Sequence, residues 1–266
     1  MINSPLLPAL GGYINGHWTD ADDGRTLAVH NPVDHGHLAD VPAMGANETG
    51  RAIAAAEAAL DSPTDRATRR GWLDAIADSL TRHREEIGRI LCMEHGKPLA
   101  EAQGEADYAA GFFRYAARQI DALAPHTLDD HPRGCTWTVH HRPAGVVGLI
   151  TPWNFPIGMI AKKLSAAIAA DCPSVIKPSS KTPLTMIALF TLLERDAGLP
   201  AGRVNLVMGG AGPITQALFD APALRVISFT GSTEVGRALI RQSAPGIKRL
   251  ALELGGNAPY IIFDDA

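Results

Sequence analysis

Hydrophobic and polar positions follow different periods in successive parts of this chain. Near its start, Tyr13 to Trp18 places Asn-Gly between apolar and aromatic residues, which is typical of a β-hairpin. A second short strand is predicted near Leu38 to Val41. From Asn47, a candidate helix N-cap, the pattern of hydrophobic positions becomes typical of helices. It predicts helices over residues 51–60, 64–83, 85–95 and 99–124, which carry no obvious site and are interpreted as scaffold.

The pattern changes again after Pro125. Residues 136–142 favour a strand, and Val146 to Ile150 are apolar on both faces, as in a strand buried within a parallel sheet. Strands and helices then alternate, with strands predicted at 174–177, 204–207, 225–229, 249–252 and 259–263, and helices at 158–170, 183–195, 213–219 and 232–242. This alternation predicts an α/β fold: a Rossmann-like parallel sheet with helices on both faces, preceded by the N-terminal hairpin and the helical segment. Ligands bind at the carboxyl ends of such strands, so the informative residues should follow each strand.

Composition narrows the class of protein. The 266 residues include 24 Lys and Arg against 28 Asp and Glu, which gives a net charge of −4. This balance, without a basic stripe, argues against nucleic acid as a partner. No apolar run reaches the roughly 18 residues of a membrane helix, and the first residues do not resemble a signal peptide. Cys92, Cys135 and Cys172 are odd in number and lack metal-ligand spacing, so we expect no disulfide framework, no metal site and a cytoplasmic location.

Two candidate sites follow the first two strands of the alternating region. The first strand runs into Thr151-Pro152-Trp153-Asn154, where an amide side chain between prolines can donate to a developing oxyanion. A Pro-bounded loop whose Asn satisfies its own backbone is the structural alternative. The second strand ends in Lys177-Pro178-Ser179-Ser180, where a Lys can hold ribose hydroxyls or phosphate oxygens, or else lie along the surface.

Two further motifs follow later strands. Gly231 and Gly236 bracket the start of a helix, whose free N–H groups can receive a pyrophosphate. The spacing matches neither a Walker A loop nor the G-x-G-x-x-G fingerprint, so a capped turn between strand and helix, without a ligand, is the alternative interpretation. Glu253, beside Gly255-Gly256, is a candidate general base, and burial is expected to raise its pKa toward neutrality. A glycine turn with an incidental acid is the alternative.

These motifs together resemble the aldehyde dehydrogenase family, most closely its bacterial succinate-semialdehyde branch. The matching segments are TPWNFP, IKPSS, FTGSTEVGR and LELGGNAP, with EHGKPLAEAQGE earlier in the chain. The resemblance implies that a Cys thiolate attacks an aldehyde, a hydride passes to NAD or NADP, and water releases an acid. It implies that Asn154 steadies the oxyanion and that Glu253 activates water. It places the cofactor against Thr151, Pro152, Trp153, Lys177, Pro178, Ser179, Ser180, Gly212, Gly231, Ser232 and Leu254.

Two departures from the family pattern affect specificity. NAD-preferring relatives often carry Glu at the position of Ser180, where it would repel a 2′-phosphate, so Ser180 and Lys181 favour tolerance of NADP. Relatives that take succinate semialdehyde often carry Arg at the position of Lys162, which keeps the charge but loses the bidentate fork. We therefore expect a small, carboxylated aldehyde as substrate, with an exposed helical Lys as the alternative for Lys162.

The third departure is the nucleophile. The chain stops at Ala266, before the family's catalytic Cys, and Cys172 is interpreted as a small buried apolar residue. We expect the chain alone to be inactive. The expected division is an incomplete dinucleotide-binding domain over 1–126 and 144–266, with an oligomerisation hairpin over 127–143 that makes the full-length form a homo-oligomer.

Three hypotheses follow from this reading. The first is part of an NAD(P)-dependent enzyme that oxidises an aldehyde, succinate semialdehyde above all, to a carboxylic acid. The second is a non-catalytic nucleotide-binding module, and the third is an assembly fragment that pairs through the hairpin. Asn154 and Glu253 favour the first, because a pure binding module needs neither an oxyanion donor nor a base.

Overall fold

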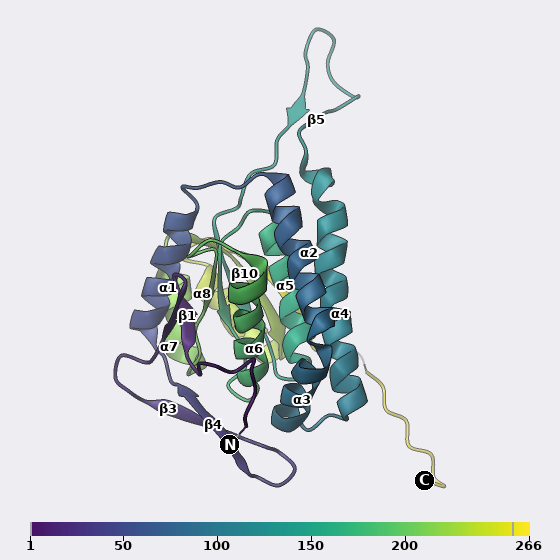
Figure 1. Cartoon of the computed structure of the whole chain (residues 1–266). Helices are drawn as coiled ribbons and strands as arrows, with labels where there is room; N and C mark the ends of the chain where they lie inside the picture. The colour runs from purple at the N-terminus through teal and green to yellow at the C-terminus, as the bar shows by residue number, and fades with distance from the viewer. Residues whose placement is uncertain (1, 257) are drawn as a thin grey trace.

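The computed structural model describes residues 2–256 and 258–266. A sheet lies at its centre (Figure 1). This sheet has seven strands in the order β11-β10-β7-β8-β9-β1-β2. The five parallel strands are β7 (Val146–Ile150), β8 (Ser174–Lys177), β9 (Val204–Leu206), β10 (Leu224–Gly231) and β11 (Arg249–Leu254). All residues of β7 and β8 are buried, as the continuous apolar runs predict.

The N-terminal hairpin extends this sheet in the antiparallel direction. β1 (Gly12–Ile14) pairs with β2 (His17–Thr19) and, on its other side, with β9. Asn15 and Gly16 join the strands with φ angles of 51° and 83°, the left-handed conformation that two-residue hairpin turns require. The hairpin prediction is confirmed. The second predicted strand lies within β4 (His37–Pro42), which pairs with β3 (Thr26–His30) in a separate two-stranded sheet.

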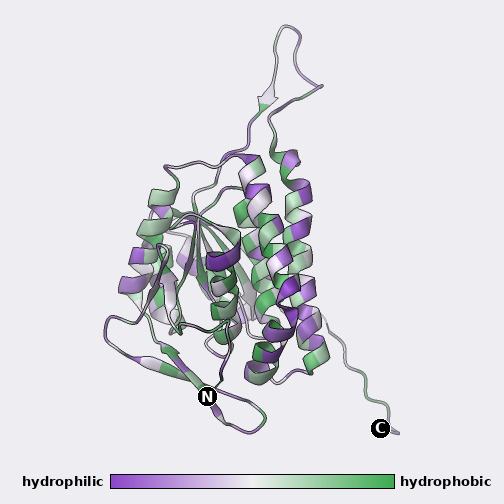
Figure 2. Ribbon diagram, viewed as in Figure 1, coloured by the Kyte–Doolittle hydropathy of each residue, from purple (hydrophilic) through white to green (hydrophobic). Residues whose placement is uncertain are grey.

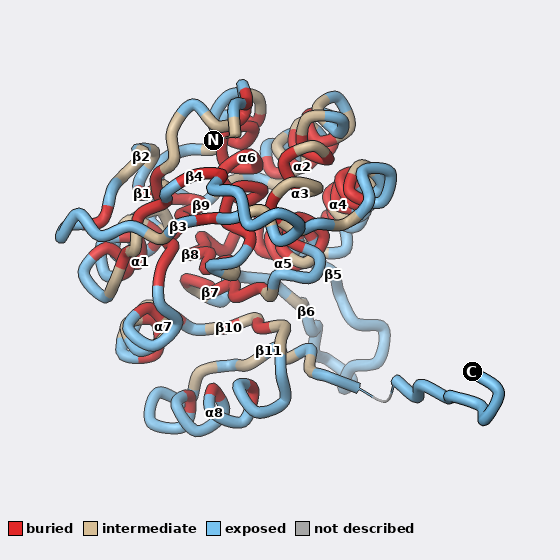
Figure 3. Tube along the Cα trace, turned by 90° about the horizontal axis from the view of Figure 1, so that it is seen from below, coloured by how far each residue is buried: buried red, intermediate tan, exposed pale blue. Residues whose placement is uncertain are grey.

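Helices cover both faces of the large sheet, which confirms the predicted fold class. On one face lie α5 (Pro156–Ala169) and α6 (Leu184–Leu192), with α2 (Arg66–Arg82), α3 (Arg84–His95) and α4 (Leu99–Gln119) packed outside them. The other face carries α1 (Ala46–Ala59), α7 (Ala211–Asp220) and α8 (Thr233–Ser243) (Figure 3). Each face has its own apolar core, and the helices show hydrophobic residues interspersed with polar ones (Figure 2). No helix in the described part of the chain is long and apolar enough to cross a membrane.

Two local predictions are wrong. The predicted N-cap Asn47 lies in the first turn of α1, because that helix begins earlier and Gly45 precedes it. Glu48 accepts a hydrogen bond from the Gly45 backbone N–H at 2.8 Å and another from Asp22 at 2.7 Å. The predicted strand at Pro259 to Phe263 does not form. No strand among the described residues pairs with it, and the side chains from Tyr260 to Phe263 are 71% to 89% exposed.

The segment predicted as an oligomerisation hairpin projects from the body of the molecule (Figure 1). Only Thr138–Val139 (β6) of the predicted strand 136–142 is paired, against His126–Thr127 (β5). Two hydrogen-bonded positions on each strand make a weak ladder. The rest of this β-favouring run remains outside regular structure because no further strand lies beside it.

Two buried glutamates connect the outer helices to the two helices, α5 and α6, that lie on the sheet. Glu94, at the end of α3, accepts bonds from the backbone N–H groups of Leu184 and Thr185 at 2.7 Å each and from the Thr185 hydroxyl. Glu105, in α4, accepts bonds from the N–H groups of Ile157 and Gly158 at 3.0 and 3.1 Å. These N–H groups are the first of α6 and α5, which have no acceptor inside their own helices. Burial raises the pKa of Glu94 to about 7.

Replacing Glu94 by Gln should destabilise the chain by about 1–3 kcal/mol, because an amide NH2 group would face the Leu184 N–H. The difference in unfolding free energy between the wild type and Glu94→Gln should be larger at pH 5 than at pH 8. Glu94 binds its proton more tightly when folded, so the stability of the wild type falls as pH rises toward and through about 7, and Gln lacks this proton. Urea unfolding at both pH values measures this. Glu85→Gln, exposed on the same helix, is the control, and equal losses in both variants would contradict the assignment.

Candidate functional site

Strand register brings the sequence motifs to one edge of the sheet. Lys177 on β8 lies opposite Ile150 on β7, Ile150 lies opposite Phe229 on β10, and Thr230 lies opposite Glu253 on β11. The chain proceeds from β7 outward through β8 and β9, then returns to the other side of β7 with β10. A crevice forms where strand order reverses in this way, between β7 and β10, and it is where nucleotides bind in such sheets.

The loop after β7 combines a buried hydroxyl with an exposed indole and amide. Thr151 is buried and its hydroxyl oxygen has no partner among the described atoms. After Pro152, Trp153 is 48% exposed, with the His95 ring centroid 5.7 Å away and the Lys181 ammonium 5.5 Å from its ring. Asn154 is exposed, so its amide is free to meet a ligand.

Sequence reasoning missed the pair that fixes this loop. The Lys97 ammonium donates to Glu105 and, at 3.2 Å, to the Asn154 carbonyl oxygen, and it lies 4.3 Å from the centre of the Phe155 ring. Glu105 also holds the first N–H groups of α5, so the backbone is fastened on both sides of the Asn154 side chain. Both residues occur in EHGKPLAEAQGE, but their contact with the loop is visible only in the fold.

At the end of β8, the Lys177 ammonium has hydrogen-bond donors that are not used within the described structure. Lys177 is 6% exposed, its one recorded bond in the described structure is to the Pro178 carbonyl oxygen at 2.9 Å, and burial lowers its pKa. Ser179 accepts a bond from the Lys181 N–H at 3.2 Å. The exposed Ser180 lines a cavity of about 380 Å³ that Lys181 and Trp153 also line.

The glycine turn after β10 opens α8. Ser232 caps this helix by accepting a bond from the Val235 N–H at 3.2 Å. Any side chain at position 231 would overlap the Phe229 ring, so this turn suits glycine. Leu254 packs so closely against Gly236 that a side chain there would also overlap it. Gly212 lies in the first turn of α7 with open space around it.

Glu253 does not have the buried environment predicted from the sequence. It lies within β11, its side chain is 46% exposed, and its carboxylate pairs with the Lys162 ammonium at 3.0 and 3.1 Å. The hydrogen bond from Lys162 holds the pKa of Glu253 below its usual range, which is opposite to the predicted direction. Lys162 is therefore an exposed lysine of α5 whose ammonium is paired with Glu253.

Lys163 is a second site residue that the sequence analysis missed. It donates to the Ser228 hydroxyl at 2.9 Å, burial lowers its pKa to about 8, and its charge acts on Glu253. A cavity of about 690 Å³ is lined by Lys162, Lys163, Ser228 and Glu253. In the sequence, Lys163 is marked only by its position next to Lys162 in the helix predicted over residues 158–170.

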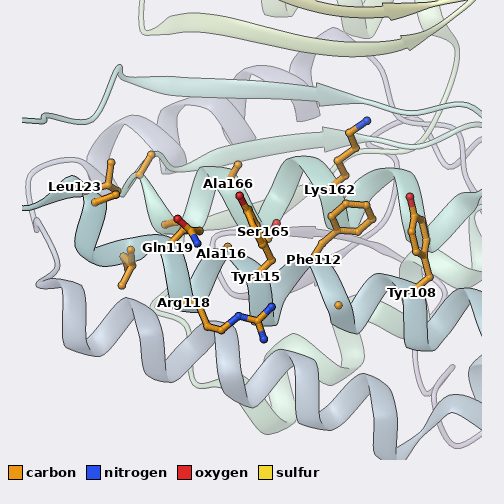
Figure 4. A pocket seen from close by; sticks show the side chains of 15 residues that line it. Tyr108, Phe112, Tyr115, Ala116, Arg118, Gln119, Leu123, Lys162, Ser165 and Ala166 are labelled. Carbon is orange, nitrogen blue, oxygen red and sulfur yellow. The ribbon is translucent and has the colours of Figure 1, made fainter.

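The structure does not place every candidate in one cavity. Glu253 and Lys162 share one, whereas Asn154 lines none of the main cavities of the described residues. A groove of about 810 Å³ between α4 and α5 also reaches Lys162, and Figure 4 shows Lys162, Phe112 and Tyr108 at one end of it. Asn154 lies in the loop that follows β7 and Glu253 lies near the end of β11, so both are on the same edge of the sheet, with β10 between the two strands.

The residues at this edge fit a dinucleotide. The unpartnered Thr151 hydroxyl, the spare donors of Lys177 and the side-chain-free turn at Gly231 suit a ligand rich in hydroxyl and phosphate oxygens. No group of three His, Cys, Asp or Glu side chains within the described ranges is arranged to hold a metal ion.

Comparison with known proteins defines the family. The profile of the Aldehyde dehydrogenase family matches residues 18–266. The chain is 45% identical over 259 residues to the NADP⁺ succinate-semialdehyde dehydrogenase of Escherichia coli K12, covering 95% of this chain and 53% of that protein. A glutarate-semialdehyde dehydrogenase of Pseudomonas aeruginosa is 43% identical, covering 96% and 53%. The chain therefore belongs to the aldehyde dehydrogenase family, and it spans about half the length of the curated relatives it matches.

A solved structure supports the same assignment. An oxidoreductase from Marinobacter aquaeolei is 59% identical and superposes with a TM-score of 0.95, covering all of this chain and 56% of that one. The predicted family is thus confirmed by sequence and by fold.

Replacing Lys162 by Met should raise the pKa of Glu253 toward that of an ordinary glutamate, because the strongest bond to its charged form is lost. Carbon-13 NMR of labelled glutamate carboxyls measures the titration. Lys181→Met is the control, since this ammonium lies over Trp153 and should leave Glu253 unchanged. An unaltered Glu253 titration in Lys162→Met would show that another group governs it.

Proposed function

We propose that this chain supplies the NAD(P)-binding part, the oxyanion donor and the base of an enzyme that oxidises an aldehyde with a distal anionic group to the acid. The observation that carries this proposal is the register of β8, β7, β10 and β11, which aligns Lys177, the Asn154 loop, Gly231 and Glu253 along one edge.

The cofactor roles follow from position along this edge. Lys177 and Ser180 hold the adenosine ribose, and the Gly231-Ser232 turn receives the pyrophosphate at the N-terminus of α8. The remaining proposed contacts flank this path and are Thr151, Pro152, Trp153, Pro178, Ser179, Gly212 and Leu254. NAD(P) supplies the hydride acceptor when bound.

The chemical roles fall to two side chains. Asn154 donates its amide N–H to the oxygen that becomes negative when the aldehyde carbon is attacked. Glu253 takes a proton from the water that releases the acid. None of the three cysteines suits the attack: burial raises the pKa of Cys172, Cys92 lies in α3, and Cys135 lies in the projecting hairpin. We place the attacking thiolate outside these 266 residues.

The substrate class follows from the charge at Lys162. Relatives are named for succinate semialdehyde, glutarate semialdehyde and, in Pseudomonas putida, 3-sulfolactaldehyde. Each of these aldehydes carries a carboxylate or sulfonate remote from the reacting carbon. Lys162 lines the groove between α4 and α5 and offers the matching cation. Succinate semialdehyde is our first choice among them.

Two further proposals concern assembly and location. The hairpin over 127–143 projects from the body and exposes half of Trp137, which supports a role in forming a homo-oligomer (Figure 1). The three free thiols support a reducing, cytoplasmic compartment. A small aldehyde, and not a nucleic acid or a membrane, is the proposed partner.

The cofactor preference is tested at Ser180. Relatives include an NADP⁺ enzyme and a betaine aldehyde dehydrogenase of Staphylococcus aureus solved with NAD⁺. Ser180→Glu should weaken NADP⁺ binding roughly tenfold or more and change NAD⁺ binding little, since the new carboxylate repels the 2′-phosphate. Titration of the chain with each cofactor, followed by tryptophan fluorescence, gives both dissociation constants. Ser180→Gln is the neutral control, and equal changes for the two cofactors would refute the role of Ser180.

The reaction is tested in a chimera that joins this chain to the remaining residues of the E. coli relative. It should oxidise succinate semialdehyde with a kcat/KM roughly tenfold or more above that for butanal, because only the former carries the carboxylate. Lys162→Met should remove most of this preference, with Arg82→Met, an exposed cation at the end of α2, as the control. Equal kcat/KM values for the two aldehydes would contradict the substrate class. An unchanged kcat/KM in Asn154→Ala would contradict the proposed role of the Asn154 amide.

A further inference from the structure

The Lys162–Glu253 pair joins the proposed substrate cation to the proposed base. Lys162 projects from α5 and Glu253 from β11, 91 residues later, and one ammonium bonds both oxygens of one carboxylate. Each side chain is 46% exposed, so the pair is open to exchange with a soluble anion. A carboxylate held in this way has both oxygens engaged and is a poor acceptor for a water proton.

Lys162 lies at the boundary of two cavities. One is the groove between α4 and α5, with Tyr108, Phe112 and Tyr115, and the other is the cavity that contains Glu253. The Lys162 side chain rises away from the aromatic rings toward the strands (Figure 4). Because Lys162 lines both cavities, an anion in the groove and the Glu253 carboxylate compete for the same side chain.

We propose that the distal carboxylate of an aldehyde substrate displaces Glu253 from Lys162, so that the base is released only when a substrate of the right charge is bound. This inference rests on the proposed function and adds to it a control of the base by the substrate. The ion pair between Lys162 and Glu253 is exchanged for one between Lys162 and the substrate carboxylate, so the number of ion pairs stays the same while one negative charge is added.

The groups around Glu253 set its response. Lys162 and Lys163 face it from α5, and Thr230 from β10 donates to it at 3.3 Å. Once Lys162 turns to the substrate, Glu253 keeps the Thr230 bond and the influence of Lys163, which is bonded to Ser228. A second carboxylate then lies near, so loss of the bond and like-charge repulsion both raise the pKa of Glu253. A base with a higher pKa accepts a proton more readily.

In this proposal, the enzyme distinguishes anionic from neutral aldehydes by whether Glu253 is released from Lys162. A neutral aldehyde occupies the groove without breaking the pair, so it meets an engaged base and loses kcat more than KM. A simple electrostatic clamp at Lys162 would instead raise KM for the neutral aldehyde and leave the base unaffected.

The test uses the chain itself, with succinate as the probe and succinamide as its neutral control, at matched ionic strength. Carbon-13 NMR follows the Glu253 carboxyl and nitrogen-15 NMR the Lys162 ammonium. Succinate should shift Lys162 and raise the pKa of Glu253, whereas succinamide should do neither. In Lys162→Met, succinate should produce no further change at Glu253. Thr230→Val, which keeps the pair, should retain the response.

Two results would overturn the inference. A succinate-dependent shift at Lys162 without a change in the Glu253 titration would show that the ammonium serves both carboxylates at once. No shift at either residue at the highest succinate concentration would show that Lys162 does not receive the carboxylate. Titration of the same samples with NADP⁺ separates the two proposals, because cofactor binding tests the proposed function and does not depend on the Lys162–Glu253 exchange.

Discussion

The first backbone N–H groups of α5 and α6 have no acceptor within their own helices, and buried side chains from other helices satisfy them. Each helix follows a central strand, and its first N–H groups need acceptors from outside. Glu105 and Glu94, carried by α4 and α3, provide them from buried positions. The outer helical layer thus determines where the loops after β7 and β8 lie, and with them Asn154 and Lys177. Helices α3 and α4, which carry none of the candidate site residues predicted from the sequence, thus position the loops that do.

Charge pairing governs the other end of the edge. Two neighbouring lysines of α5 face the strands, but burial separates their roles: Lys163 is bonded to Ser228, whereas the exposed Lys162 is engaged by Glu253. Under the proposed function, the ammonium that binds the substrate anion is the one that pairs with the proposed base, Glu253, in this structure. The proposed cofactor contacts, in contrast, are backbone turns and the spare donors of Lys177, which need no such exchange. The two proposed functions are therefore separable by experiment.

Short apolar runs, Asn-Gly and strand-end motifs were enough to predict the hairpin, the strand order along the chain and the edge where candidates lie. They could not predict contacts between distant segments. The Lys162–Glu253 pair depends on the register of β10 and β11, and the capping by Glu94 and Glu105 depends on helix packing. Tyr260 to Phe263 has the composition of a strand, but a strand also needs a neighbour, which local sequence does not reveal.

We propose that one edge of the sheet binds a redox cofactor beside the groups that act on a carbonyl. A crystal structure of this chain with NADP⁺ tests this arrangement. We expect the adenosine ribose at Lys177, the pyrophosphate at the start of α8 and the nicotinamide between the Asn154 amide and Glu253. A cofactor bound elsewhere, or bound here with its nicotinamide directed away from both side chains, would refute the arrangement.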